Sequence, residues 1–380
     1  MKKHILVTGS CGFIGQNLIS ALQVDPDVAL LTFDLENTPT DLAHALDQAD
    51  VIFHLAGVNR PKDPQEFATG NTGLTQSICQ HLIAKGRKPQ LVMSSSVQAE
   101  LDNPYGVSKR QAEEAVQQYA AKTGAAVAIY RLPNVFGKGC RPNYNSAVAT
   151  FCHNIAHNLP ITVNDPKVAL KLVYIDDVVE EFLRVLAVGP TRQGAFCAVP
   201  TVHAVSLGEI VDLLYSFRQS RTDLQVPNQA DPFTRKLYAT YLSYLPADQF
   251  SYPLKMNVDA RGSFTEFLKT KERGQVSVNI SKPKITKGNH WHHTKNEKFL
   301  VVSGRGIIRF RRVGSAESGA GSGIVEYPVS GEKLVVVDIP PGYTHNIENT
   351  GDTDLVTVMW ANEPFNPQKP DTIVASVALQ

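Results

Sequence analysis

Tyr105 and Lys109 have the residue types and the spacing of a proton-transfer pair. Residues four apart share one face of a helix, so the lysine ammonium can lie beside the phenol and favour its ionised form. Such a tyrosine can pass a proton to or from a carbonyl oxygen while hydride moves at the carbon. The serines at 94–96 end the preceding apolar run and can supply a hydroxyl that polarises the same oxygen. The alternative is an ordinary surface pair, because this spacing often arises by chance.

A glycine-rich turn near the N-terminus predicts a dinucleotide site. The turn reads Gly9-Ser-Cys-Gly12-Phe13-Ile14-Gly15 and lies between a strand-like run and a helix-like pattern. Glycine allows a sharp turn and a close approach of backbone to a pyrophosphate, and the free N–H groups of a helix N-terminus attract the anion. The alternative is a glycine-rich turn that binds no ligand.

Two further segments are expected to border the same cofactor. Asp34 falls 19 residues after Gly15, where a carboxylate bonds the adenosine ribose and repels a 2′-phosphate. That reading favours NADH, and the alternative is a solvated turn aspartate. The run Leu55-Ala56-Gly57 ends the next strand-like segment, where backbone is expected beside the adenine and the pyrophosphate.

A second group of reactive side chains lies late in the chain and suggests a metal site. His290 and His292 are two residues apart, Glu297 follows closely, and His345 comes later. Alternate residues of a strand face the same way, so both early histidines can point into one interior. Three histidines and a carboxylate can hold Zn²⁺ or a similar divalent ion with a position left for substrate. The alternative is a surface histidine cluster.

The elements that must hold the first group alternate between strands and helices. Apolar runs of strand length occur at residues 4–7, 29–33, 51–55, 90–93 and 127–130. Helical patterns lie between them, for example at 13–22 and 111–121. This alternation predicts βαβ units and a doubly wound parallel sheet.

After about residue 245 the helical periodicity fades and short β-rich runs follow one another closely. They lie at residues 276–280, 298–302, 306–310, 334–338 and 355–360. Residues 314–323 are rich in Gly, Ser and Ala and predict a hairpin loop. The pattern is typical of an antiparallel sandwich or barrel. We therefore expect one domain over 1–245 and another over 246–380.

The composition excludes several classes of function. A chain of 380 residues suggests two domains. Its 37 basic and 36 acidic residues leave no excess charge to neutralise phosphates, so a nucleic-acid partner is not expected. No apolar run reaches the roughly 20 residues of a membrane span. The five cysteines form no CxxC pair, which favours free thiols in a reducing cytoplasm over disulfides.

Residues 1–240 resemble the extended short-chain dehydrogenase/reductase family, particularly its nucleotide-sugar branch. Besides the glycine turn and YxxxK, the resemblance covers the segments at 131–137 and 173–178. It implies a Rossmann fold, NADPH as cofactor, and Ser96, Tyr105 and Lys109 as the catalytic set. It also implies that the nucleotide sugar lies beside Asn134, Tyr144, Asn145 and Ser146. Val97 and Gln98 follow Ser96 where dehydratases of this family carry acidic residues, which argues against dehydration.

The histidine-rich region resembles the cupin superfamily, with matches to HxH(x)4E(x)6G and PxG(x)2H(x)3N. That resemblance implies a jelly-roll β-barrel with the four metal ligands named above, and cupins commonly pair into dimers. Residues 259–266 and 287–290 also resemble sugar-nucleotide 3,5-epimerases, in which the residue at the position of His290 is a base and no metal is bound. His290 is therefore a ligand or a base. Arg261 and Lys287 are candidate diphosphate contacts, or else ordinary surface cations.

The full length resembles bifunctional capsular polysaccharide enzymes of the CapF type. This resemblance implies that the cupin domain epimerises C3 of a UDP-2-acetamido-2,6-dideoxy-4-ketohexose. The N-terminal domain would then reduce the C4 ketone with NADPH or NADH. The product implied is the UDP-N-acetyl-6-deoxy-L-talosamine, a precursor of UDP-N-acetyl-L-fucosamine. The alternative is a nucleotide-sugar reductase or epimerase with a non-catalytic sugar-binding or dimerisation cupin.

Overall fold

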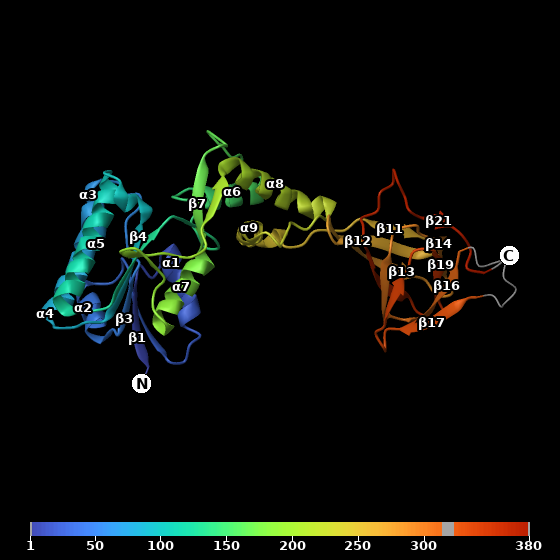
Figure 1. Cartoon of the computed structure of the whole chain (residues 1–380), viewed down its shortest axis with the longest axis horizontal. Helices are drawn as coiled ribbons and strands as arrows, with labels where there is room; N and C mark the ends of the chain where they lie inside the picture. The colour runs from blue at the N-terminus through green and yellow to red at the C-terminus, as the bar shows by residue number, and fades with distance from the viewer. Residues whose placement is uncertain (1, 314–322, 379–380) are drawn as a thin grey trace. The chain divides into compact units, whose positions relative to one another are not determined.

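The computed structural model describes residues 2–313 and 323–378 of the chain (Figure 1). The loop predicted at 314–323 lies outside these residues except for its last glycine. The chain divides into two compact units: residues 1–215 with 232–246, and residues 216–231 with 247–380. The domain boundary expected between residues 245 and 246 stays a prediction.

The first unit contains ten strands, ten complete helical segments and the start of one more among the described residues. The strands are β1 (Lys3–Thr8), β2 (Val28–Phe33), β3 (Val51–His54), β4 (Gln90–Ser96), β5 (Val127–Leu132), β6 (Asn134–Phe136), β7 (Ala169–Tyr174), β8 (Arg192–Gln193), β9 (Phe196–Cys197) and β10 (His203–Ser206). The α-helices are α1 (Phe13–Leu22), α2 (Pro39–Gln48), α3 (Gln65–Phe67), α4 (Leu74–Ala84), α5 (Pro104–Thr123), α6 (Ala147–Ala156), α7 (Ile175–Ala187) and α9 (Pro232–Leu242). Between them lie the π-helix η1 (Ala68–Gly73) and the 3-10 helix η2 (Val97–Glu100), while α8 (Leu207–Asp223) begins in the first unit and ends in the second.

A seven-stranded sheet organises this unit in the order β2-β1-β3-β4-β5-β9-β8. The pairs from β2 to β9 are parallel, and only the last pair, β8 with β9, runs antiparallel. Helices α1 and α7 cover one face, and α2, α4 and α5 cover the other (Figure 1). Val178 and Phe182 of α7 are buried against the first face, and Ile78 and Val116 against the second. The predicted parallel sheet is thus confirmed.

The second unit consists mainly of antiparallel strands. They are β11 (Met256–Asp259), β12 (Gly262–Thr270), β13 (Gly274–Ser281), β14 (Thr286–Trp291), β15 (Glu297–Ser303), β16 (Arg305–Arg312), β17 (Val325–Ser330), β18 (Val336–Ile339), β19 (Tyr343–Asn349), β20 (Leu355–Ala361) and β21 (Ile373–Val374). The 3-10 helix η3 (Ala247–Gln249) precedes them.

These strands form two sheets that share one core. The six-stranded sheet has the order β11-β12-β13-β20-β15-β18, and the five-stranded sheet has the order β17-β16-β19-β14-β21. Phe299 of β15 and Ile308 of β16, which belong to different sheets, are buried in the same cluster. The inner faces of the two sheets therefore pack together, as the β-rich runs predicted.

None of the helices in residues 2–313 and 323–378 combines the length and the hydrophobicity that a bilayer span requires.

Candidate active site

The glycine turn of the first unit brings three backbone segments into close contact. Gly9 has a φ of +70°, and a Cβ there would lie 2.6 Å from the nitrogen of Ala56. A Cβ on Gly15 would lie 2.1 Å from the carbonyl oxygen of Gly9. Helix α1 begins at Phe13, and its N-cap residue Gly12 offers no side chain to its first N–H groups. The turn therefore leaves donors open to an anion at the end of β1.

Asp34 follows β2 and supports this turn from the neighbouring strand. Its carboxylate accepts hydrogen bonds from the backbone N–H of Cys11, at 2.7 Å, and of Leu35, at 2.8 Å. Leu55, Ala56 and Gly57 come directly after β3, as predicted. A Cβ on Gly57 would lie 3.8 Å from Nζ of Lys109, so this segment also borders the tyrosine–lysine pair.

The structure brings Ser96, Tyr105 and Lys109 together. Ser96 ends β4, while Tyr105 and Lys109 lie in the first two turns of α5. Asn103 caps that helix by accepting a hydrogen bond from Gly106 N–H at 2.7 Å. The short segment between Ser96 and the helix folds into η2, which lets β4 and α5 meet within a few residues.

Burial controls the acid–base properties of this set. Lys109 is 6% exposed and donates a hydrogen bond to the carbonyl oxygen of Ser94 at 2.7 Å. Its burial lowers the pKa of Lys109 to about 8, against the opposing effect of the Glu113 carboxylate. Burial raises the pKa of Tyr105, and a hydrogen bond with Ser96 acts in the other direction. A buried ammonium one helical turn from a half-buried phenol that contacts a hydroxyl is able to support proton exchange with a carbonyl oxygen.

Glu113 and Asn71 were not identified from the sequence, yet both hold this site in place. The buried Glu113 carboxylate accepts hydrogen bonds from the Ser95 hydroxyl and from Arg131, whose Nη2 lies at 2.6 Å. Asn71, in the π-helix η1, donates to the hydroxyl of Ser108 at 3.0 Å and accepts from Val58 N–H at 2.8 Å. Acidic and amide residues within helices carry no local signal of such a role.

The predicted sugar-binding residues lie around the end of β5 and the start of α6. Asn134 is exposed at the start of β6, and Tyr144 is half-buried beneath the Arg141 guanidinium, 5.3 Å from the ring centroid. Asn145 is exposed. Ser146 is the N-cap of α6 and accepts a hydrogen bond from Ala149 N–H at 3.2 Å, so part of its bonding capacity serves the helix.

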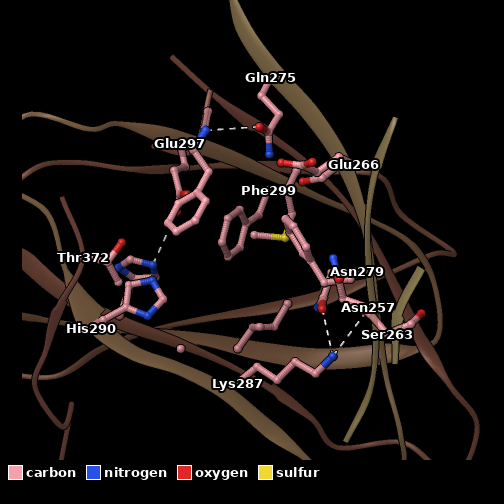
Figure 2. Close-up of a pocket in the computed structure, with 18 of the residues that line it drawn as sticks. Asn257, Ser263, Glu266, Gln275, Asn279, Lys287, His290, Glu297, Phe299 and Thr372 are labelled. Carbon is pink, nitrogen blue, oxygen red and sulfur yellow. Dashed lines mark hydrogen bonds and ion pairs between the residues drawn. The ribbon is translucent and has the colours of Figure 1, made fainter. Parts of the chain in front are cut away.

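The second unit contains a partly open cavity of about 830 Å³. Figure 2 shows His290 and Glu297 at one end of it and Glu266, Asn257 and Ser263 at the other. Amides, hydroxyls and charged groups line it together with aromatic rings such as Phe299, a mixture typical of sites for polar small molecules.

Four potential metal ligands gather in this cavity: His290, His292, Glu297 and His345. Their ligand atoms all lie within 4.8 Å of one another. The Glu297 carboxylate is 3.5 Å from Nε2 of His292 and 3.6 Å from Nε2 of His345. These three atoms are buried and have no hydrogen-bond partner among the described residues. Converging buried atoms without partners are the arrangement that a bound divalent ion would satisfy.

The surroundings prepare these groups for such a role. Burial opposes ionisation of Glu297, but the adjacent imidazoles of His292 and His345 outweigh it and hold the pKa of Glu297 at about 2. Burial lowers the pKa of His290 to about 4, and the charges of neighbouring groups, including Lys295, contribute. Nδ1 of His292 bonds to the backbone carbonyl of Asp371, which leaves Nε2 facing the cluster.

Arg261 and Lys287, the candidate diphosphate contacts, both line the cavity. Arg261 is exposed and pairs with Asp259, with 2.6 Å between Nη2 and the carboxylate. Lys287 donates to the side-chain oxygen of Asn279 at 2.9 Å (Figure 2) and to the carbonyl of Ile280 at 2.8 Å. Burial lowers the pKa of Lys287. A third hydrogen bond, to the carbonyl of Ser263 at 3.4 Å, means that all three of its donors already connect β14 to β12 and β13 of the six-stranded sheet.

Comparison with known proteins covers both units. Residues 5–194 match the NAD dependent epimerase/dehydratase family, and residues 257–373 match the polysaccharide biosynthesis C-terminal domain. The chain is 45% identical over 98% of both sequences to a Pseudomonas aeruginosa protein named UDP-2-acetamido-2,6-beta-L-arabino-hexul-4-ose reductase.

Solved structures agree with this similarity. The crystal structure of the capsular polysaccharide assembling protein CapF from Staphylococcus aureus has a TM-score of 0.92 and 55% identity, and covers 98% of this chain and 99% of that one. UDP-glucuronic acid 4-epimerase from Bacillus cereus, solved with NAD, covers 63% of this chain and 98% of that one at a TM-score of 0.54 and 20% identity, which shows a shared fold alone. The chain therefore belongs to the CapF-type family, whose members join an epimerase/dehydratase domain to a polysaccharide biosynthesis C-terminal domain.

Proposed function

We propose that the chain is a bifunctional nucleotide-sugar enzyme of capsule or O-antigen biosynthesis. Its first unit reduces the C4 ketone of a UDP-2-acetamido-2,6-dideoxy-4-ketohexose. The observation that carries this proposal is the 45% identity, over 98% of both chains, to a relative named as a reductase of such a UDP-linked 4-keto sugar. The half-buried Ser96 and Tyr105, together with the buried Lys109, supply chemistry that suits the reaction.

The predicted catalytic and cofactor-binding residues of the first unit have distinct roles in this proposal. NADPH or NADH, bound at the glycine turn, supplies the hydride. Tyr105 gives its proton to the C4 oxygen, Ser96 hydrogen-bonds the same oxygen, and Lys109 holds positive charge beside the phenol. Asp34 places a negative charge where a 2′-phosphate would lie, so it favours NADH.

We propose that the second unit is a cupin barrel that epimerises C3 before the reduction. The C4 ketone acidifies the C3 proton, and a base in the cavity removes it so that it can return on the opposite face. The partnerless Nε2 atoms of His292 and His345 and the Glu297 carboxylate fit a divalent ion such as Zn²⁺. That ion would stabilise negative charge on the substrate. His290 serves as its fourth ligand or as the base.

Reduction is tested with the purified full chain and the 4-keto sugar. Consumption of each reduced nicotinamide and deuterium incorporation at C3 in D₂O are followed in parallel. Tyr105→Phe is expected to abolish reduction and to leave C3 exchange intact, because the two reactions use different residues. Lys109→Met tests the role of Lys109. Its control is Lys122→Met, because Lys122 is an exposed lysine of the same helix. Near wild-type reduction by Tyr105→Phe would show that the role given to Tyr105 is wrong.

We further propose that the enzyme is a cytoplasmic homodimer. Sedimentation of the purified protein tests the dimer, and cell fractionation tests the cytoplasmic location.

A further inference from the structure

Lys295 is a buried cation of the second unit that has no acidic partner. It lines the cavity and is only 6% exposed. Among residues 2–313 and 323–378, no carboxylate lies within 4.0 Å of its ammonium, and the centroid of the Phe365 ring lies 5.8 Å from it. Lysines are rarely this buried without a paired charge, because burying an unpaired charge is costly.

Hydrogen bonds to a single carboxylate hold the backbone around Lys295. The Asp371 carboxylate accepts hydrogen bonds from the N–H groups of His293, Thr294 and Lys295, at 2.8–2.9 Å. The carbonyl of the same Asp371 bonds to His292. One residue therefore positions both a candidate metal ligand and the buried lysine.

Other cations of the two sites differ from Lys295 in one respect. Lys109 and Lys287 donate to backbone carbonyls, and Arg261 pairs with Asp259. The Lys295 ammonium makes no hydrogen bond to the described residues, so its N–H donors are available to a molecule that enters the cavity. A buried ammonium binds best to an oxygen whose negative charge develops during the reaction.

We propose that Lys295 is a further catalytic residue of C3 epimerisation and donates a hydrogen bond to the C4 oxygen as that oxygen becomes an enolate. The inference rests on the proposed function of the second unit. When the C3–H bond breaks, the proton passes to a base and the electron pair forms the C3–C4 double bond. The carbonyl π pair moves to the C4 oxygen, beside Lys295. The carbonyl reforms when a proton adds to the opposite face of C3.

The test is C3 deuterium exchange of the 4-keto sugar in D₂O by full-length Lys295→Met, followed by NMR. Loss of one such donor is expected to slow exchange about 100- to 1,000-fold. Lys298→Met is the matched control, because Lys298 is exposed, pairs with Asp338 and does not line the cavity. Reduction by the first unit, measured with sugar that has already been epimerised, should not change.

Two further measurements separate this role from others. UDP binding by calorimetry should be equal in wild type and Lys295→Met, whereas loss of UDP affinity would assign Lys295 to the diphosphate and overturn the proposal. Lys295→Ala should regain exchange, with saturation, when ethylammonium is added. Absence of any recovery in a variant that melts like the wild type would also count against it.

The outcomes distinguish the inference from its premise. If the wild-type chain does not exchange the C3 proton, the epimerase function of the second unit is wrong and Lys295 has no such role. If the wild type exchanges and Lys295→Met does so at the same rate, only the role of Lys295 is wrong.

Discussion

Glu113 is the residue on which the geometry of the reductase site most depends, and Glu113→Gln tests that dependence. Its side chain is 3% exposed and joins β4, through Ser95, to β5, through Arg131. It projects from α5, four residues after Lys109. Replacing the carboxylate by an amide keeps the shape and removes the charge, so packing is preserved while the ion pair is lost.

The stability loss follows from the environment of the pair. Removing one partner of a buried ion pair costs about 3–5 kcal/mol. Arg131 keeps a second partner, Glu100, at 3.2 Å, and its side chain is 19% exposed. We therefore expect the low end, about 3 kcal/mol, which corresponds to a fall in Tm of about 6–12 °C for a domain of this size class.

The same change should shift the pH dependence of reduction. Residues four apart on a helix are roughly 6 Å apart, and two unit charges at that distance interact by about 3 kcal/mol at an effective dielectric constant near 20. Arg131 already compensates much of the Glu113 charge, so we expect about one pH unit. The sign follows from Lys109, whose pKa is about 8 and is raised by Glu113. Without that carboxylate Lys109 loses its proton at lower pH, and the basic limb of the profile moves down.

The assay is the pH profile of kcat/KM for nicotinamide-dependent reduction, together with calorimetric melting. Glu114→Gln is the matched control, because Glu114 is the adjacent, exposed residue of the same helix. The reasoning fails if Glu113→Gln has the same Tm as Glu114→Gln and if the basic limb of its kcat/KM profile coincides with that of the wild type.

Two other changes probe the cofactor and the metal. Asp34→Asn keeps an acceptor for Cys11 N–H but removes the charge. We therefore expect the preference for NADPH over NADH to rise about tenfold, equivalent to about 1.4 kcal/mol. KM values for both coenzymes measure this preference, and an unchanged ratio would place Asp34 outside the ribose site. Dialysis against a chelator should abolish C3 exchange and leave reduction intact, with metal content counted by mass spectrometry; exchange by a metal-free preparation would show that His292, Glu297 and His345 do not act through an ion.

The sequence predicted those parts of the site whose signals are local. Helix α1 has the bounds 13–22 that its apolar spacing indicated, and the predicted helix 111–121 lies within α5. Ser96, Tyr105 and Lys109 come together because a strand end and the next helix are only a few residues apart. The HxH spacing likewise predicted that His290 and His292 face the same way. His290 lies in β14, His292 directly follows that strand, and both line the cavity.

Residues that act through distant contacts were not predictable in this way. Asn71 lies in a π-helix, and its partner Ser108 is 37 residues away. Glu113 is one of two adjacent acidic residues of α5, and only the packing of α5 on β4 and β5 shows that it is buried. A carboxylate in a helix is usually solvated, so its burial depends on partners that periodicity cannot identify.

The candidate metal ligands show why a local motif is incomplete without its distant support. His292 and Glu297 are specified by a motif of a few residues, but Asp371, which bonds to His292 and to the backbone of the intervening loop, lies 76 residues beyond Lys295. The second histidine nitrogen must have an acceptor if the first is to face a metal. His292 finds that acceptor in Asp371 and His345 finds it in the Tyr343 carbonyl at 3.4 Å, whereas the His290 ring has none among the described residues. The three histidines are therefore not equivalent: the His290 ring is positioned by edge-on packing against His292 and His345, with centroids 5.1 and 4.7 Å away, whereas the other two are also hydrogen-bonded to the backbone.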